Sequence, residues 1–209
     1  YYIKSPENVQ RSQIEILAGK LYEMAGVRVP KTKLIKIDGK INNTQINRLG
    51  IASRIEDVED INVSKMVGLN GVDENFAVDA WLANWDVIGT GGAKELNLKL
   101  LKDGNALRLD TGGSLFYRAR GALKTYDGND VPELSSLLDN TLNPNAKMAF
   151  SKLNEDKIVN GVQRIVAIND DAIRAVVKET IEDDVVASEL AEKIIGRKNF
   201  LANKYKKQL

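Results

Sequence analysis

Three oxygen-bearing side chains lie in one stretch of the chain, and their types and spacing suit phosphoryl transfer. Asp86 stands in a glycine-containing loop, Asn97 begins the apolar run that follows, and Asp110 ends a second apolar run. The turn between the two runs reads Lys-Asp-Gly-Asn, and Asp-Gly between alternating runs is a strong hairpin signal. A hairpin would bring Asn97 and Asp110 to one end of a small sheet, with Asp86 entering from the preceding loop. There, one carboxylate can orient an attacking hydroxyl, while an amide and a second carboxylate hold Mg²⁺ on the phosphates.

Local turn chemistry offers a simpler explanation of the same residues, since Asp and Asn are common wherever a chain turns. The elements around them therefore decide between the two interpretations. A strand that ends in Lys4 opens the chain, and a helix expected from Ser5, Pro6 and Glu7 to about Ala25 follows. Glu15 lies beside the apolar stripe of that helix, and we predict that it pairs with Lys4. In the alternative interpretation, Lys4 and Glu15 are both solvated surface residues.

Composition removes several other classes of site. The 209 residues contain no histidine and no cysteine, so disulfides, thiolate zinc sites and histidine-based triads are excluded. Acid–base chemistry must then use Asp, Glu, Lys or Tyr. A net charge of +1 gives no global field that would favour nucleic acid, and no apolar run approaches the ~18 residues of a membrane span.

The next elements are expected to form a small sheet with an acidic exit. Residues 27–41 are predicted to form a hairpin that turns at Asp38-Gly39. A further strand ends at Ile55 and leads into Glu56 and Asp57. We interpret this exit as a hinge whose backbone would contact adenine, although a simple strand-to-loop exit explains it equally well.

The remainder of the chain is predicted to be mainly helical. A buried helix from Asp73 to Trp85 delivers the chain into Asp86, with Trp81 and Trp85 in the core. Further helices are predicted at 132–139, 144–153, 156–168, 170–180 and 184–206.

A basic cluster follows the Asp110-Thr-Gly-Gly segment. Arg118, Arg120 and Lys124 could meet phosphate or an acidic substrate, or could simply be solvated.

The order of these elements resembles the atypical protein-kinase-like families, namely the HipA-type, actin-fragmin and phosphoinositide kinases. Those families show a helix ending in an Asn-x-Asp loop, a downstream Asn and a strand that ends in a metal-binding Asp. Asn84-Trp85-Asp86, Asn97 and Asp110 match that pattern here. The resemblance covers roughly residues 1–120. The chain also resembles, more distantly, kinase-like domains of phage and secreted bacterial proteins.

The resemblance implies an α+β fold of two lobes. Residues 1–58 would form a small antiparallel-sheet lobe that lacks its upstream strands, and residues 59–209 a larger, mainly helical lobe. No glycine-rich phosphate loop is visible, so we expect one upstream of Tyr1 or none at all.

The resemblance also implies an ATP-dependent phosphotransferase, a Ser/Thr kinase that acts on a protein. Asp86 would be the catalytic base, Asn97 and Asp110 the Mg²⁺ ligands, and Lys4 the phosphate-binding residue. Glu15 would position Lys4, with Glu56 and Asp57 in the nucleotide-binding hinge. A bacterial or phage-encoded protein of the cytoplasm is expected, with secretion into a host cell left open. The alternatives are an inactive pseudokinase or binding module, and AMP transfer on the same fold.

Overall fold

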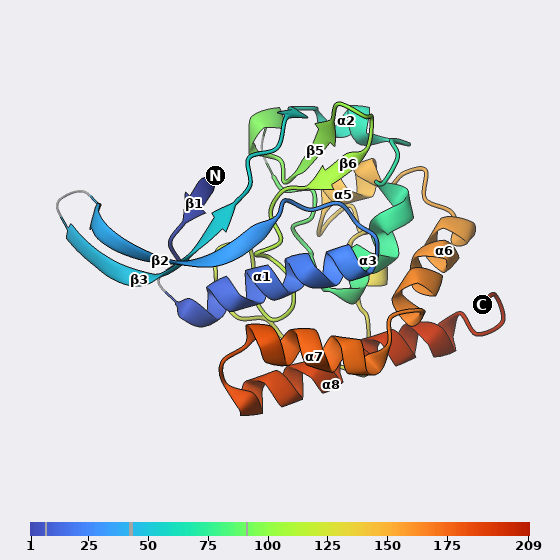
Figure 1. The fold of residues 1–209 in the computed structure, drawn as a ribbon. Coiled ribbons are helices and arrows are strands. Elements are labelled where there is room, and N and C mark those ends of the chain that lie inside the picture. Colours follow the sequence, from blue (N-terminus) through green and yellow to red (C-terminus); the bar gives the residue numbers. More distant parts are fainter. Residues whose placement is uncertain (7, 42–43, 91) are drawn as a thin grey trace.

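Two small antiparallel sheets and a larger helical part make up the chain, as the computed structural model in Figure 1 shows. The predicted α+β class is thereby confirmed. The structure describes residues 1–6, 8–41, 44–90 and 92–209. Glu7 in the predicted helix start and Gly91 in the predicted loop lie outside the described residues.

The first sheet has the order β1-β3-β2, with β1 at Tyr2–Lys4, β2 at Thr32–Ile41 and β3 at Thr44–Ser53. Strand β2 continues through Asp38 and Gly39, which pair with Asn47 and Ile46 of β3. The predicted turn at Asp38-Gly39 is therefore wrong, because the long ladder with β3 keeps both residues extended and overrides the local turn preference. The β2–β3 hairpin projects away from the rest of the molecule (Figure 1).

Helix α1, at Val9–Met24, carries Glu15 and packs against β2, β3 and α7. The side chain of Asn8 caps the helix by accepting a hydrogen bond from the backbone N–H of Gln10 at 2.8 Å. The predicted cap at Ser5 is wrong, because Asn8 is itself a favoured N-cap and starts the helix three residues later. Gly26 ends the helix with a φ of 73°, as glycine readily does.

The second sheet has the order β4-β5-β6, with β4 at Val58–Glu59, β5 at Leu98–Leu101 and β6 at Ala106–Arg108. Strands β5 and β6 are antiparallel and Gly104 takes a φ of 80° in the turn between them. The predicted hairpin is confirmed.

A helical part supports this second sheet. It comprises α2 (Val63–Met66), a 3₁₀ turn (Asp73–Asn75), α3 (Phe76–Trp81), α4 (Glu133–Ser136), α5 (Pro144–Ala149), α6 (Glu155–Val166), α7 (Asp170–Thr180) and α8 (Asp184–Lys204). In Figure 1, α7 and α8 lie side by side along the face of α1 that is turned away from the first sheet. None of the described helices is long and apolar enough to cross a lipid bilayer.

The predicted helix from Asp73 to Trp85 is shorter than expected. It ends at Trp81, and the next turn includes Ala83 at a φ of 53°. Trp81 is fully buried, but Trp85 is 37% exposed, so its predicted core position is wrong. The early end of the helix turns Trp85 out of the core and brings Asp86 to the surface of the second sheet.

Candidate functional site

The β5–β6 hairpin brings Asn97 and Asp110 to one end of the second sheet. Asn97 immediately precedes β5, and Leu98 pairs with Arg108 of β6. Beyond the ladder, the backbone N–H of Leu109 donates to the carbonyl of Asn97 at 2.7 Å. Asp110 is the next residue, so the hairpin places the two predicted metal ligands near each other, as the sequence indicated.

Asn97 also holds the loop that carries Asp86. Its side-chain amide donates to the backbone carbonyl of Asp86 at 2.8 Å and to Oδ2 of the same residue at 2.9 Å. The loop passes close to Asn97 at Gly89, where an added Cβ would lie only 3.0 Å from the Asn97 backbone nitrogen. Gly89 also has a φ of 82°, so glycine is required there for two reasons.

The environment of Asp86 shifts the pKa of its carboxyl. Its carboxyl is half-buried, and burial raises its pKa above the ordinary value, although the hydrogen bond from Asn97 opposes the rise. A carboxylate of raised pKa is a better general base near neutral pH than a fully solvated one.

The predicted Lys4–Glu15 pairing is confirmed, and it extends to Asp110. Lys4 Nζ lies 2.7 Å from Glu15 Oε1 and 2.9 Å from Asp110 Oδ2. Burial lowers the pKa of Lys4, but the charges of Glu15 and Asp110 outweigh it and raise that pKa above the usual value. Lys4 therefore carries a positive charge between the two sheets.

The Thr-Gly-Gly segment after Asp110 fits against α1. The hydroxyl of Thr111 donates to the backbone carbonyl of Glu15 at 3.0 Å, and the N–H of Gly112 donates to Asp110 Oδ1 at 2.8 Å. A Cβ on Gly112 would approach Glu15 Oε2 to 2.8 Å. Glycine at this position is what allows Glu15 and Asp110 to share Lys4.

A pocket of about 380 Å³ adjoins these groups. It is lined by Lys4, Asn97 and Asp110, and by the exit from β3, including Ile55 and Glu56. Its volume falls in the range of small-molecule and cofactor sites.

Glu56 and Asp57, the two predicted hinge residues, have different surroundings. Glu56 lines this pocket, and its Oε1 lies 3.8 Å from Nε of Arg54. Asp57 does not line it, because its side chain is 74% exposed and forms an ion pair with Lys102. The structure thus brings Glu56, but not the Asp57 side chain, to the remaining predicted residues.

A second pocket, of about 550 Å³, reaches Asp86. Trp85, Arg118, Arg120 and Lys124 also line it. Asp86 lines this pocket and Asn97 lines the first, so the two hydrogen bonds between these residues link the two pockets.

Sequence reasoning did not identify the role of Lys124. Its ammonium donates to the backbone carbonyls of Gly113, at 2.7 Å, and Ala83. It thereby ties the segment after Asp110 to the turn before Asp86. Burial lowers the pKa of Lys124 to about 8. The sequence around Lys124 gives no signal for such a contact, because both acceptors are backbone atoms.

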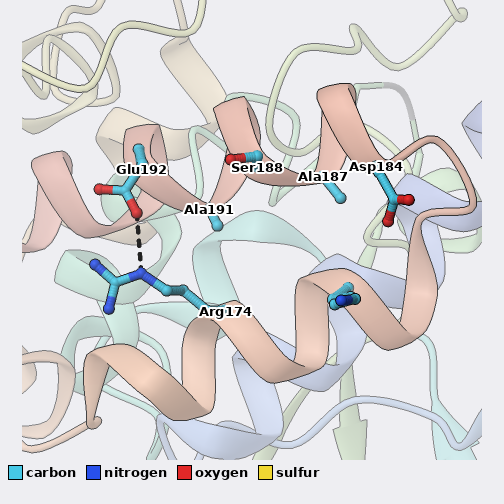
Figure 2. A pocket seen from close by; sticks show the side chains of 7 residues that line it. Arg174, Asp184, Ala187, Ser188, Ala191 and Glu192 are labelled. Atoms are coloured by element: carbon cyan, nitrogen blue, oxygen red, sulfur yellow. Dashed lines mark hydrogen bonds and ion pairs between the residues drawn. The ribbon is translucent and has the colours of Figure 1, made fainter.

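A third hollow, of about 350 Å³, lies between α7 and α8 and is shown in Figure 2. Arg174 on α7 pairs there with Glu192 on α8, Nε to Oε1 at 2.9 Å. None of the predicted site residues lines it. We regard it as a helix–helix groove and not as part of the candidate site.

The donor set suits a magnesium ion that is shared with phosphates. Among the described residues, no three carboxylate, imidazole or thiol side chains gather in a metal-binding arrangement. Asn97 and Asp110 would supply two oxygen ligands, as Mg²⁺ sites in phosphoryl-transfer enzymes commonly have. The Asn97 amide oxygen accepts no hydrogen bond from a described residue, and the Asp110 side chain is 40% exposed. A metal ion would share the Asp110 carboxylate with Lys4 and the Gly112 N–H, whereas the Asn97 amide oxygen has no such contact with a described residue.

Comparisons with family models, curated proteins and solved structures give no match to this chain.

Proposed function

We propose that the chain is an ATP-dependent phosphotransferase with a protein-kinase-like fold, which transfers phosphate to a Ser or Thr hydroxyl of a protein. One observation carries the proposal. Lys4 contacts both Glu15 and Asp110, while Asn97 holds Asp86. Residues spread over more than half of the chain thus converge between two pockets in the arrangement that phosphoryl transfer uses.

In the proposed division of the fold, residues 1–58 form the smaller lobe and residues 59–209 the larger. The pocket of about 380 Å³ supports this division because its lining comes from both parts. Lys4 and Glu56 contribute from the first part, and Asn97 and Asp110 from the second. A nucleotide in this pocket would place its base against the exit from β3 and its phosphates beside Lys4.

Each residue then has a defined task. Lys4, held by Glu15, binds the phosphates through its positive charge. Asn97 and Asp110 provide oxygen ligands for Mg²⁺, which neutralises charge on the phosphates when it is bound. Asp86 accepts the proton of the acceptor hydroxyl, and the raised pKa of its carboxyl suits that role.

The decisive experiment is Asp86→Ala, assayed with ATP labelled at the γ-phosphate and, in parallel, at the α-phosphate. We expect turnover of the γ-label to fall by roughly 10²–10⁴-fold, the usual contribution of a positioned general base. ATP affinity and melting temperature should change little, because Lys4, Asn97 and Asp110 remain. Asp156→Ala, which removes an exposed aspartate in the first turn of α6, is the matched control and should leave turnover and ATP affinity unchanged.

The same assay separates the alternatives. Transfer of the α-label instead of the γ-label would identify AMP transfer. ATP binding without transfer of either label would identify an inactive binding module. Unchanged γ-phosphate transfer by the Asp86→Ala protein would contradict the assignment of this loop.

A further inference from the structure

A closed turn carries two arginines to the mouth of the pocket that contains Asp86. Tyr117 and Leu123 form an antiparallel bridge at its base. Inside the bridge, the N–H of Arg118 donates to the carbonyl of Ala122 at 2.7 Å, and the N–H of Gly121 donates to the carbonyl of Arg118 at 2.8 Å. Hydrogen bonds within the turn therefore fix the backbone that presents Arg118.

Helix α1 anchors the tip of this turn. The guanidinium of Arg11 donates to the carbonyl of Ala119 at 2.7 Å. Gly121 has a φ of 87°, and a Cβ there would lie 2.7 Å from Nη1 of Arg11. The turn thus packs closely on the helix that carries Glu15. Because hydrogen bonds hold the backbone of this turn, its two arginines lose less conformational freedom on binding a ligand than arginines on an unstructured loop would.

The charges of Arg118 and Arg120 are not neutralised within the described part of the chain. Both side chains are exposed, and neither has an ion-pair partner among the described residues. Two acidic residues line the same pocket: Glu133 is already paired with Arg197 of α8, and Asp86 accepts a hydrogen bond from Asn97. Several other arginines form ion pairs, as in Arg28–Asp103, Arg108–Asp79 and Arg174–Glu192.

We propose that this pocket binds an acidic polypeptide segment and that Arg118 and Arg120 select acceptor hydroxyls flanked by Asp or Glu. The inference rests on the proposed function. Guanidinium groups match carboxylates through paired hydrogen bonds, and two of them beside Asp86 favour an anionic ligand. The partly exposed Trp85 ring adds an apolar surface suited to a peptide chain, which a small inorganic anion would not use.

The proposed phosphate transfer involves the acceptor hydroxyl, a nucleoside triphosphate and Asp86. The acceptor hydroxyl oxygen forms a bond to the γ-phosphorus of a nucleoside triphosphate, and the bond from that phosphorus to the β–γ bridging oxygen breaks. The nucleoside diphosphate leaves with the electron pair, and the hydroxyl proton passes to Asp86. Arg118 and Arg120 hold the flanking carboxylates and take no part in bond making.

The test compares two fluorescent serine peptides that differ only in their flanking residues, Asp and Glu in one and Lys in the other. Anisotropy measures their binding to the full chain without nucleotide, and γ-labelled ATP measures phosphate transfer. We expect the acidic peptide to bind at least about tenfold more tightly, with the preference weakening as salt rises. The double variant Arg118→Glu, Arg120→Glu should abolish the preference.

The matched control is Lys152→Glu, Lys178→Glu, which changes net charge equally at two exposed lysines outside this pocket. Equal loss of the preference in both double variants, or equal binding of the two peptides by the unaltered chain, would overturn the inference. Displacement of the peptide by an equal concentration of inorganic phosphate would also overturn it, since the site would then be one for a small anion.

The two proposals fail separately. Phosphate transfer to both peptides at equal rates would leave the phosphotransferase standing and remove the acidic selection. Arginine-dependent binding of the acidic peptide without transfer of label would support the binding surface and contradict the enzymatic activity.

Discussion

Two ion pairs in this molecule join a cation to a carboxylate, but one is buried and the other is partly exposed to solvent. Arg108 and Asp79 lie 2.7 Å apart with both side chains fully buried. In the other group, the Lys4 side chain is 24% exposed and that of its partner Asp110 is 40% exposed. The first pair is sealed inside the protein, whereas the second opens onto a pocket.

Other protein groups form hydrogen bonds with both members of the buried pair. The hydroxyl of Tyr22 donates to Asp79 Oδ1 at 2.9 Å, and Arg108 donates to the carbonyls of Val72, at 3.1 Å, and Gly71. These bonds connect α1, α3 and β6, so this pair acts as a scaffold. The Lys4 group retains access to solvent, and under the proposed function Lys4 would exchange one carboxylate for a phosphate. Exposure, more than the identity of the charges, separates the two pairs.

The largest expected effect comes from breaking the buried pair. Arg108→Ala would leave the Asp79 carboxylate buried without a cation, and such changes destabilise by about 3–5 kcal/mol. Urea denaturation should show this loss in the free energy of unfolding. Because burial makes the lone charge unfavourable, the double variant Arg108→Met, Asp79→Leu should regain most of the stability. A loss below about 1 kcal/mol in Arg108→Ala would contradict the scaffold role.

A smaller loss of stability, with a clear effect on binding, is expected from Lys4→Met. The free energy of unfolding should fall by about 1–2 kcal/mol, because Glu15, whose pKa burial raises, can take up a proton when its cation is removed. ATP affinity, measured by calorimetry, should fall about tenfold or more, as expected for the loss of a charge-assisted contact. Lys31→Met removes an exposed pair with Glu23 and should leave ATP affinity unchanged. Similar losses of ATP affinity in Lys4→Met and Lys31→Met would contradict a specific role of Lys4 in ATP binding.

The last expected effect is confined to alkaline pH and is a change in the pH dependence of stability caused by Lys124. Its pKa is about 8 in the folded chain, against 10.5 ordinarily. Between these values the unfolded chain binds more protons than the folded chain, so this residue makes stability rise as pH increases from about 8 to 10.5. Lys124→Met should remove that rise in melting temperature. The slope should stay unchanged in Lys147→Met, which alters an exposed lysine on α5.

The parts of the site that sequence reasoning predicted are those with a local pattern. The β5–β6 hairpin followed from an Asp-Gly turn between apolar runs, and its ends placed Asn97 and Asp110. The Lys4–Glu15 contact followed from a strand and a helix in succession. In both cases the interacting residues lie within or beside consecutive elements, so chain order constrains their geometry.

The parts that were missed depend on contacts between distant segments. The Asp38-Gly39 dipeptide predicts a turn by itself, but pairing with β3 decided its conformation. The contact between Lys4 and Asp110 joins residues more than a hundred positions apart. The Lys124 contacts use backbone carbonyls, which carry no side-chain identity. Local propensity cannot reveal such interactions, because the tertiary fold creates them.

The projecting β2–β3 hairpin has a mechanical consequence. Strand β3 is the central strand of its sheet, and it pairs with β1 at Ile51 and Lys4. The hairpin and Lys4 therefore belong to one hydrogen-bonded sheet, and β2 and β3 of that sheet pack against α1. Strand β3 thus connects the outer part of the hairpin directly to Ile51, which pairs with Lys4. Under the proposed function, a protein that bound the outer part of this hairpin would act on the strand beside the phosphate-binding lysine without entering the pocket.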